Sequence, residues 1–182
     1  MEERTIDRAT LSSAFDELSR EISRAGEKSA EIRLFGGTAM MLQFSERGAT
    51  LDVDCVVTRG HGAVMRAMPI VARRLGLPSG WLNEGVSVYR SRHETDGDFA
   101  EMFALPSRRP VLRILAARPR YLMAMKISAL DRGAARDRSD ISLAAGSLAI
   151  TTLDEAQESY RRYFADGMET AHSGTISTLL RS

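Results

Sequence analysis

Apolar residues recur along this chain with two periods, one typical of helices and one typical of strands. In residues 9–24 an apolar side chain returns every three or four positions, as on the buried face of an amphipathic helix. Residues 51–58 and 111–116 are short and mostly apolar, as buried strands are. The pattern predicts a mixed α/β (α+β) protein, with a small mixed β-sheet core followed by a helical half.

The other elements follow from the same periods, helped by proline and glycine. Pro119 lies where proline favours the first turn of a helix, and Gly146 marks the end of another. Further helices are predicted in residues 38–44, 63–75, 119–130, 136–145 and 154–164. Further strands are predicted in residues 31–35, 86–90 and 99–103, and residues 81–83 are expected to begin a helical turn.

The length of 182 residues and a hydrophobic content of 43% are those of one globular domain with a real core. We expect a single domain over residues 1–182, with an α/β core in about residues 28–116 and a helical half in about residues 117–182. No apolar run approaches the ~20 residues that span a bilayer, and the N-terminus lacks a signal sequence. We therefore expect a cytoplasmic protein without a membrane partner.

Charge and cysteine content exclude some classes of protein. A formal net charge of +1 provides no bulk field toward nucleic acid or membrane, although residues 107–138 are rich in arginine. Arginine binds phosphate well, but a GC-rich genome would raise the arginine content just as readily. The single cysteine, Cys55, excludes an internal disulfide and a cysteine-based zinc site.

Two carboxylates in one predicted strand are the main candidate for chemistry. Asp52 and Asp54 are two positions apart, so both are expected on one face, with Leu51, Val53 and Cys55 on the other. Like charges on an apolar strand repel and lose hydration, unless a hard divalent cation lies between their oxygens. A solvated edge strand is the alternative. The pattern favours a metal site.

A glycine turn precedes this strand. Gly36, Gly37 and Thr38 lie between a predicted strand and a predicted helix. Glycine allows backbone N–H groups to approach an anion, and a helix N-terminus favours negative charge. Thr38 can cap the helix or bind a phosphate oxygen. An ordinary capped turn is the alternative, but beside the aspartate pair the turn predicts phosphoryl or nucleotidyl transfer. No Walker phosphate loop is present.

A second candidate cluster lies in the helical half. Lys126 is flanked by large apolar residues, so it either extends to solvent or lies at the edge of a buried face, where it can neutralise a triphosphate. Asp137 and Asp140 are three positions apart and share one helix face. Their alternative role is pairing with Arg136 or Arg138.

Gly36-Gly37-Thr38 followed by Thr50-x-Asp52-x-Asp54 resembles the core signature of the nucleotidyltransferase (DNA polymerase β-like) superfamily. Residues 81–84 and 119–141 resemble more narrowly a bacterial family of minimal nucleotidyltransferase domains. That family is similar to the abortive-infection toxins and mycobacterial nucleotidyltransferase toxins of toxin–antitoxin pairs. The resemblance extends over about residues 31–163.

The resemblance implies a Mg²⁺- or Mn²⁺-dependent enzyme that moves an NMP from an NTP to an acceptor hydroxyl. The acceptor is a tRNA 3′ end, a protein side chain or a small molecule, and a cognate antitoxin is an expected partner. The implied catalytic residues are Asp52 and Asp54, which also bind the metal, Lys126, and either Asp140 or Asp137. The implied substrate-binding residues are Gly36, Gly37, Thr38 and Thr50.

One departure from the superfamily pattern leaves a second function open. Superfamily polymerases often carry a third metal-binding carboxylate on a later strand, where residues 111–116 offer only Arg113. Either two carboxylates hold the metal, or Asp137 or Asp140 substitutes, or the metal site is weakened. The alternative function is a non-catalytic nucleotide-binding or antitoxin-like partner protein that keeps the fold.

Overall fold

The structure is a computed structural model that describes residues 5–101, 105, 110–132, 135–168 and 170–181. The chain divides into two compact units. Unit 1 comprises Met1–Val88 and Phe99–Ala116, and unit 2 comprises Tyr89–Asp98 and Ala117–Ser182. The expected single domain stays a prediction.

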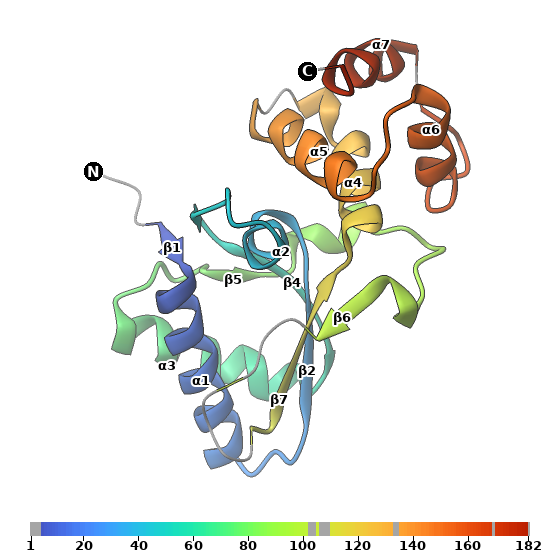
Figure 1. The fold of residues 1–182 in the computed structure, drawn as a ribbon. Coiled ribbons are helices and arrows are strands. Elements are labelled where there is room, and N and C mark those ends of the chain that lie inside the picture. Colours follow the sequence, from blue (N-terminus) through green and yellow to red (C-terminus); the bar gives the residue numbers. More distant parts are fainter. Residues whose placement is uncertain (1–4, 102–104, 106–109, 133–134, 169, 182) are drawn as a thin grey trace. The chain divides into compact units, whose positions relative to one another are not determined.

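Unit 1 contains a five-stranded mixed sheet with the strand order β5-β4-β2-β7-β6, and a small sheet formed by β1 and β3 (Figure 1). Its strands are β1 (Ile6–Asp7), β2 (Ala30–Leu34), β3 (Ala49–Thr50), β4 (Val53–Arg59), β5 (Leu82–Asn83), β6 (Phe99–Glu101) and β7 (Leu112–Ala117), which ends at the unit boundary. Its helices are α1 (Arg8–Arg24), α2 (Gly36–Gln43) and α3 (His61–Leu75). The mixed α/β class expected from the sequence is confirmed.

The strand β4, which contains Asp54, lies between β5 and β2 in the sheet. It is therefore not the solvated edge strand of the alternative interpretation. β4 is antiparallel to β2 and parallel to β5. It begins at Val53, so the predicted start at residue 51 is wrong and Asp52 lies in a bend before the strand. Val53 and Cys55 are fully buried as predicted, whereas Leu51 is 37% exposed because it lies outside the pleat.

Burial of the strand face also affects Cys55. Loss of hydration raises the pKa of its thiol to about 12, and the negative charges of Glu84 and Asp54 act in the same direction. The thiol is therefore protonated at neutral pH, and Cys55 is a small apolar core residue, as the sequence indicates.

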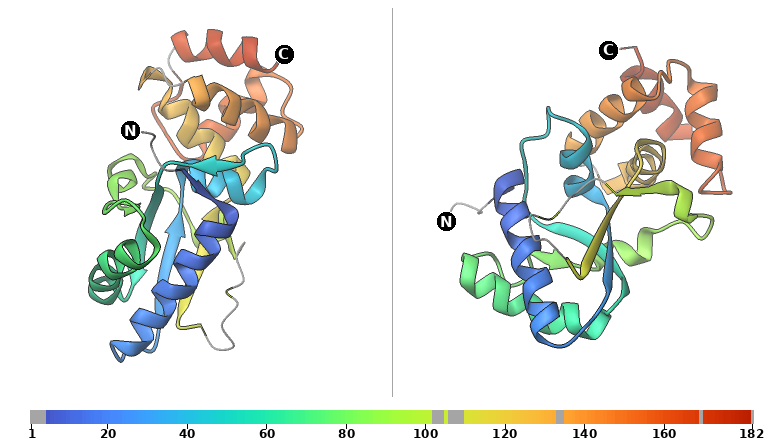
Figure 2. Two further views of the ribbon diagram at one scale, coloured as in Figure 1. Left: turned by 90° about the vertical axis from the view of Figure 1, so that its left-hand side faces the viewer. Right: turned by 60° about the horizontal axis from the view of Figure 1, so that its bottom comes forward.

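The helix α1 has the buried face that its periodicity predicts. The side chain of Asp7 caps its N-terminus by accepting a hydrogen bond of 2.7 Å from the backbone N–H of Thr10. α1 contacts α3, and the views of Figure 2 show these helices beside the sheet of unit 1. The buried side chains of α1 include Leu11, Phe15, Leu18 and Ile22.

Unit 2 consists of packed helices and one polar loop. The helices are α4 (Pro119–Ser128), α5 (Ala135–Ser147), α6 (Leu153–Arg161) and α7 (Thr170–Leu179). Pro119 opens α4 as predicted, but the helix ends at Ser128, and residues 130–132 form a short 3₁₀ helix. α5 contacts α4, and the rings of Tyr121 and Tyr163 stack with centroids 4.6 Å apart.

Two short elements differ from the expectation. Residues 86–90 are not a strand, because Gly85–Tyr89 forms a 3₁₀ helix in which Val88 is 81% exposed. Residues 81–83 do not begin a helical turn, because Leu82 and Asn83 pair with β4 as the strand β5. Of the predicted strand 99–103, residues 99–101 form β6 and the rest lies outside the described residues. No helix in the described ranges is long and apolar enough to cross a membrane.

Candidate functional site

The turn from β2 into α2 brings Asp54 against a glycine. Gly36 has φ = +53°, a left-handed conformation that favours glycine. A Cβ atom on Gly36 would overlap Oδ2 of Asp54 and would lie 3.2 Å from its Cγ. The backbone N–H of Phe35 donates to the carbonyl of Asp54 at 2.9 Å, which joins the end of β2 to β4. The carboxylate of Asp54 therefore lies beside the N-terminus of α2, where the helix dipole favours negative charge.

The second glycine is likewise covered by protein side chains. A Cβ atom on Gly37 would lie 2.7 Å from Oγ1 of Thr50 and 2.9 Å from Nη2 of Arg47. The expectation was that the glycines keep space for phosphate, but these protein atoms occupy the space beside both Cα atoms. Any phosphate binding by the turn would use the first N–H groups of α2, which lack acceptors within the helix.

Arg47 was not among the residues predicted from the sequence. Its guanidinium lies at the Gly37 turn, from the connection between α2 and β3. The sequence signal that could have identified it is its place between Gly36-Gly37-Thr38 and Thr50-x-Asp52-x-Asp54. A guanidinium at this position adds a phosphate-binding group to the candidate site.

Two threonine hydroxyls hold the main chain of Asp52. Oγ1 of Thr38 and Oγ1 of Thr50 each donate a hydrogen bond of 3.0 Å to the carbonyl of Asp52. Both threonines are buried. Thr38 lies inside α2, and Phe35 occupies the N-cap position, so the expected capping role of Thr38 is wrong. These hydroxyls fix the bend that leads into β4.

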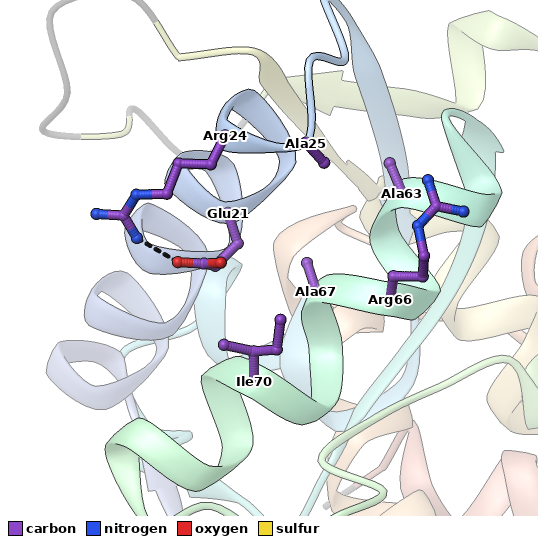
Figure 3. Close-up of a pocket in the computed structure, with 7 residues that line it drawn as sticks. All are labelled: Glu21, Arg24, Ala25, Ala63, Arg66, Ala67 and Ile70. Atoms are coloured by element: carbon purple, nitrogen blue, oxygen red, sulfur yellow. Dashed lines mark hydrogen bonds and ion pairs between the residues drawn. The ribbon is translucent and has the colours of Figure 1, made fainter.

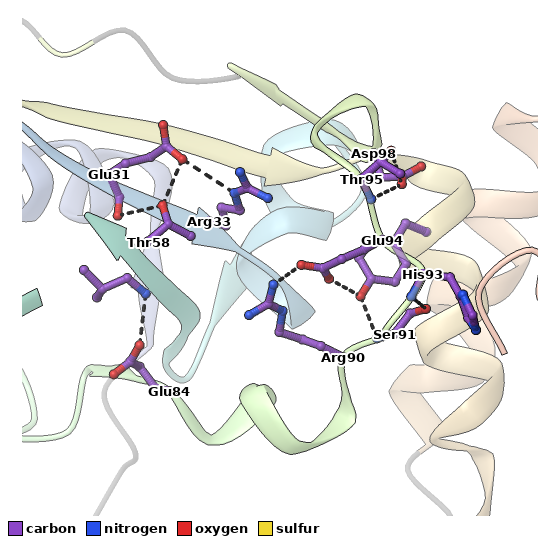
Figure 4. Close-up of polar contacts among 12 residues, drawn as sticks. Glu31, Arg33, Thr58, Glu84, Arg90, Ser91, His93, Glu94, Thr95 and Asp98 are labelled. Atoms are coloured by element: carbon purple, nitrogen blue, oxygen red, sulfur yellow. Dashed lines mark hydrogen bonds and ion pairs between the residues drawn. The ribbon is translucent and has the colours of Figure 1, made fainter. Parts of the chain in front are cut away.

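The carboxylate of Asp52 accepts a hydrogen bond from β5. Nδ2 of Asn83 donates to Oδ2 of Asp52 at 3.0 Å, and Oδ1 of Asn83 accepts from the backbone N–H of Gly85 at 3.0 Å. The neighbouring Glu84 binds the edge of β4 by accepting from the backbone N–H of Val57 at 2.9 Å (Figure 4). Residues 81–84 contribute to the family resemblance, but no role was predicted for Asn83.

In unit 2, Lys126 forms an ion pair with each of two aspartates. Its Nζ lies 2.6 Å from Oδ1 of Asp137 and 2.9 Å from Oδ2 of Asp140. The side chains of Lys126 and Asp140 are 14% and 1% exposed, so the alternative of a lysine extending to solvent is wrong. Both aspartates therefore pair with Lys126, and their pairing with Arg136 or Arg138 stays an alternative. That Lys126 faces the aspartates of unit 1 stays a prediction.

A buried aspartate in unit 2 was not predicted. Asp98 is 3% exposed, and its Oδ1 accepts from the hydroxyl of Tyr163 at 2.7 Å and from Nη2 of Arg162 at 3.2 Å. Its Oδ2 accepts from the backbone N–H and the hydroxyl of Thr95 at 2.8 and 2.9 Å (Figure 4). Residues 93–98 have no periodicity, so the sequence carries no signal of this cluster.

These contacts shift two pKa values in opposite directions. Burial raises the pKa of Asp98, but the hydrogen bonds from Tyr163 and Thr95 and the charge of Arg162 outweigh it, so the pKa lies below its usual value. Burial, followed by the nearby Asp98 carboxylate, raises the pKa of the Tyr163 phenol. Asp98 is ionised at neutral pH, and its carboxylate serves the fold.

The donor set of unit 1 suits a hard divalent cation. Mg²⁺ binds proteins through one or two carboxylates and completes its coordination with water and substrate phosphates. Asp52 and Asp54 provide two such groups, although no group of three histidine, cysteine or acidic side chains among the described residues is arranged to hold a metal. Arg113, at the strand where a third carboxylate was sought, pairs with Glu31 and Glu101.

A separate cavity of about 310 Å³ lies between α1 and α3 (Figure 3). Glu21 and Arg24 line it from α1, and Arg66 lines it from α3. Glu21 already pairs with Arg24 and Arg74. None of the predicted site residues lines this cavity, so it is not the candidate site.

Comparisons of the chain with protein-family models, with curated proteins and with solved structures found no match.

Proposed function

We propose that this protein is a metal-dependent nucleotidyltransferase. One observation carries the proposal: the first turn of α2 contacts both aspartates, since Gly36 lies against the carboxylate of Asp54 and Thr38 donates to the carbonyl of Asp52. A carboxylate beside a helix N-terminus, with the main chain of a second aspartate held by the same helix, combines groups for a divalent cation with groups for a phosphate. The glycine–aspartate resemblance supports the same function.

In this proposal Asp52 and Asp54 hold Mg²⁺ or Mn²⁺, which when bound neutralises part of the triphosphate charge. The first N–H groups of α2, at Gly36 and Gly37, bind phosphate oxygens. The acceptor hydroxyl forms a bond to the α-phosphorus, pyrophosphate leaves and the hydroxyl proton passes to water. Lys126 is the proposed cation for the triphosphate, which would take its ammonium from an ion pair with Asp137 or Asp140.

The proposed acceptor is a tRNA 3′ end or a protein hydroxyl, and the proposed setting is a toxin with a cognate antitoxin. Both follow from the resemblance to nucleotidyltransferase toxins. The arginines of residues 107–138 are compatible with an anionic acceptor.

A second candidate function is a non-catalytic nucleotide-binding or antitoxin-like partner protein. The observation that favours it is Arg113, which pairs with Glu31 and Glu101 where superfamily polymerases often have a third metal ligand. Binding alone needs only the turn and the aspartate pair. Transfer of a labelled nucleotide distinguishes the two functions.

The first test is thermal unfolding with each of the four NTPs, with and without Mg²⁺. Binding to the native state raises the melting temperature, so we expect one or more NTPs to stabilise the protein only with Mg²⁺. Asp52→Asn and Asp54→Asn should abolish this shift, and the exposed control Asp154→Asn should retain it. No NTP-dependent shift in the unchanged protein would contradict the enzyme and the nucleotide-binding protein, and would leave the antitoxin-like partner protein.

The second test is transfer from α-labelled NTPs into total cellular RNA and protein. Label in either fraction that disappears in Asp52→Asn supports the enzyme, whereas Mg²⁺-dependent binding without transfer supports the second function. Lys126→Ala should lower NTP affinity ten- to a hundredfold, because a charge-assisted contact to phosphate contributes about 1–3 kcal/mol. Unchanged affinity would remove Lys126 from the site.

A further inference from the structure

Asn83 has a side chain whose orientation is set by its own backbone. It is the last residue of β5 and pairs in register with Asp54 of β4. Its Oδ1 accepts from the N–H of Gly85 two residues later, so the carbonyl end of the carboxamide is assigned by that donor. The NH₂ end is therefore the end that meets Oδ2 of Asp52, at 3.0 Å.

Asp52 needs such a partner because of where it lies. It is exposed and belongs to a bend rather than to a strand, so neither packing nor a pleat restricts its side chain. Its carbonyl is held by Thr38 and Thr50, which fixes the Cα position but leaves χ1 and χ2 to other contacts. The hydrogen bond from Asn83 restricts the orientation of the carboxylate and engages Oδ2, so that Oδ1 is not used by this hydrogen bond.

We propose that Asn83 is a positioning residue that holds the carboxylate of Asp52 for a divalent cation bound with a nucleoside triphosphate. The assignment rests on the proposed function, and Asn83 acts through Asp52 rather than by touching the cation. Carboxylate ligands of metals are commonly hydrogen-bonded by a neighbouring group, and loss of that neighbour typically weakens metal binding by about 10- to 100-fold.

The test measures Mn²⁺ binding by electron paramagnetic resonance, in the presence of an NTP with a non-cleavable α,β-methylene bridge. Asn83→Ala should weaken Mn²⁺ binding by about tenfold or more. The matched control is Glu84→Gln, which changes the next residue of the same loop and retains an oxygen for the N–H of Val57. It should bind Mn²⁺ within about twofold of the unchanged protein, since the Glu84 side chain contacts Val57 and His61, and neither is a proposed metal-site residue.

A second variant separates positioning from folding. It combines Asp52→Asn with Asn83→Asp, so the hydrogen bond between the two side chains re-forms in the opposite direction. The carboxylate introduced at position 83 still accepts from the N–H of Gly85. We expect the urea unfolding midpoint of this exchanged variant to lie near that of the unchanged protein, while Mn²⁺ binding stays at least about tenfold weaker. If Asn83→Ala does not fold, Asn83→Ser carries the test, because its shorter side chain leaves the Asp52 carboxylate in place without the amide donor.

The outcomes are distinct. Mn²⁺ binding by Asn83→Ala equal to that of the unchanged protein, or full binding by the exchanged variant, would overturn the role of Asn83 and leave the proposed function standing. Absence of Mn²⁺–nucleotide binding in the unchanged protein would overturn both. Weaker binding in Asn83→Ala, with Glu84→Gln unaffected, supports the assignment.

Discussion

The aspartates of the two units are held in different ways. Asp98 of unit 2 is buried, and each of its carboxylate oxygens accepts two hydrogen bonds, from Tyr163 and Arg162 on one side and from Thr95 on the other. Asp52 of unit 1 is exposed, and within the part of the chain that the structure describes its carboxylate accepts from the side chain of Asn83. Unit 1 instead holds Asp52 by its main chain.

This difference separates a carboxylate that serves the fold from one suited to a ligand. The acceptor capacity of Asp98 is used by its own protein, so removing it leaves buried donors without a partner. Asp52 retains acceptor capacity, and its backbone is fixed in advance, which is the arrangement a binding residue needs.

The largest expected effect is that of Asp98→Ala on stability. The hydroxyl of Tyr163 and the N–H of Thr95 would lose a charged acceptor in a buried position, so the free energy of unfolding should fall by about 3 kcal/mol. Asp52→Ala should change it by less than about 0.5 kcal/mol, because the residue is exposed. Urea denaturation of both variants measures the difference. Equal losses in the free energy of unfolding would show that Asp98 and Asp52 contribute equally to the stability of the fold.

The glycines of the α2 turn provide the next test. Gly36→Ala introduces a Cβ at φ = +53° that overlaps the carboxylate of Asp54, so we expect a loss of about 2 kcal/mol in stability together with loss of Mg²⁺-dependent NTP binding. Gly37→Ala displaces the ends of Thr50 and Arg47, and should lower stability by about 1 kcal/mol and weaken NTP binding. A larger effect at Gly37 would mean that Asp54 does not require Gly36.

The smallest expected effect is the pH dependence that Asp98 confers. Its folded pKa lies below the ordinary value of 3.8, so the ionised carboxylate stabilises the fold above that pH, and this contribution disappears as pH falls through the folded pKa. Chemical denaturation between about pH 5 and 2.5 should show a shallower loss of stability for Asp98→Asn than for the unchanged protein. Identical slopes would contradict the assigned contacts.

At alkaline pH, Tyr163 makes stability fall as the pH rises, whereas Asp98 makes it fall as the pH decreases. The pKa of Tyr163 is raised above its ordinary value of 10, so the neutral phenol contributes stability below pH 10 that is lost as pH rises toward the folded pKa. Tyr163→Phe should remove this part of the alkaline dependence, measured by the same denaturation series above about pH 9.

Much of the fold was predictable because periodicity reports burial directly. The apolar face of α1, the alternation of Val53 and Cys55, and the start of α4 at Pro119 all follow from local patterns. The short elements were predicted less well. β5 owes its conformation to pairing with β4, and a strand of two residues is too short to show an apolar period in the sequence.

The candidate site shows the same division. The sequence by itself named the candidate residues: a glycine turn, two aspartates two positions apart, and a lysine with two later aspartates. Only the tertiary structure decided what each of them touches. Asn83 meets Asp52 across 31 positions of sequence, and Gly36 at the start of α2 meets Asp54 of β4. Such contacts depend on strand pairing and register, which local periodicity does not encode.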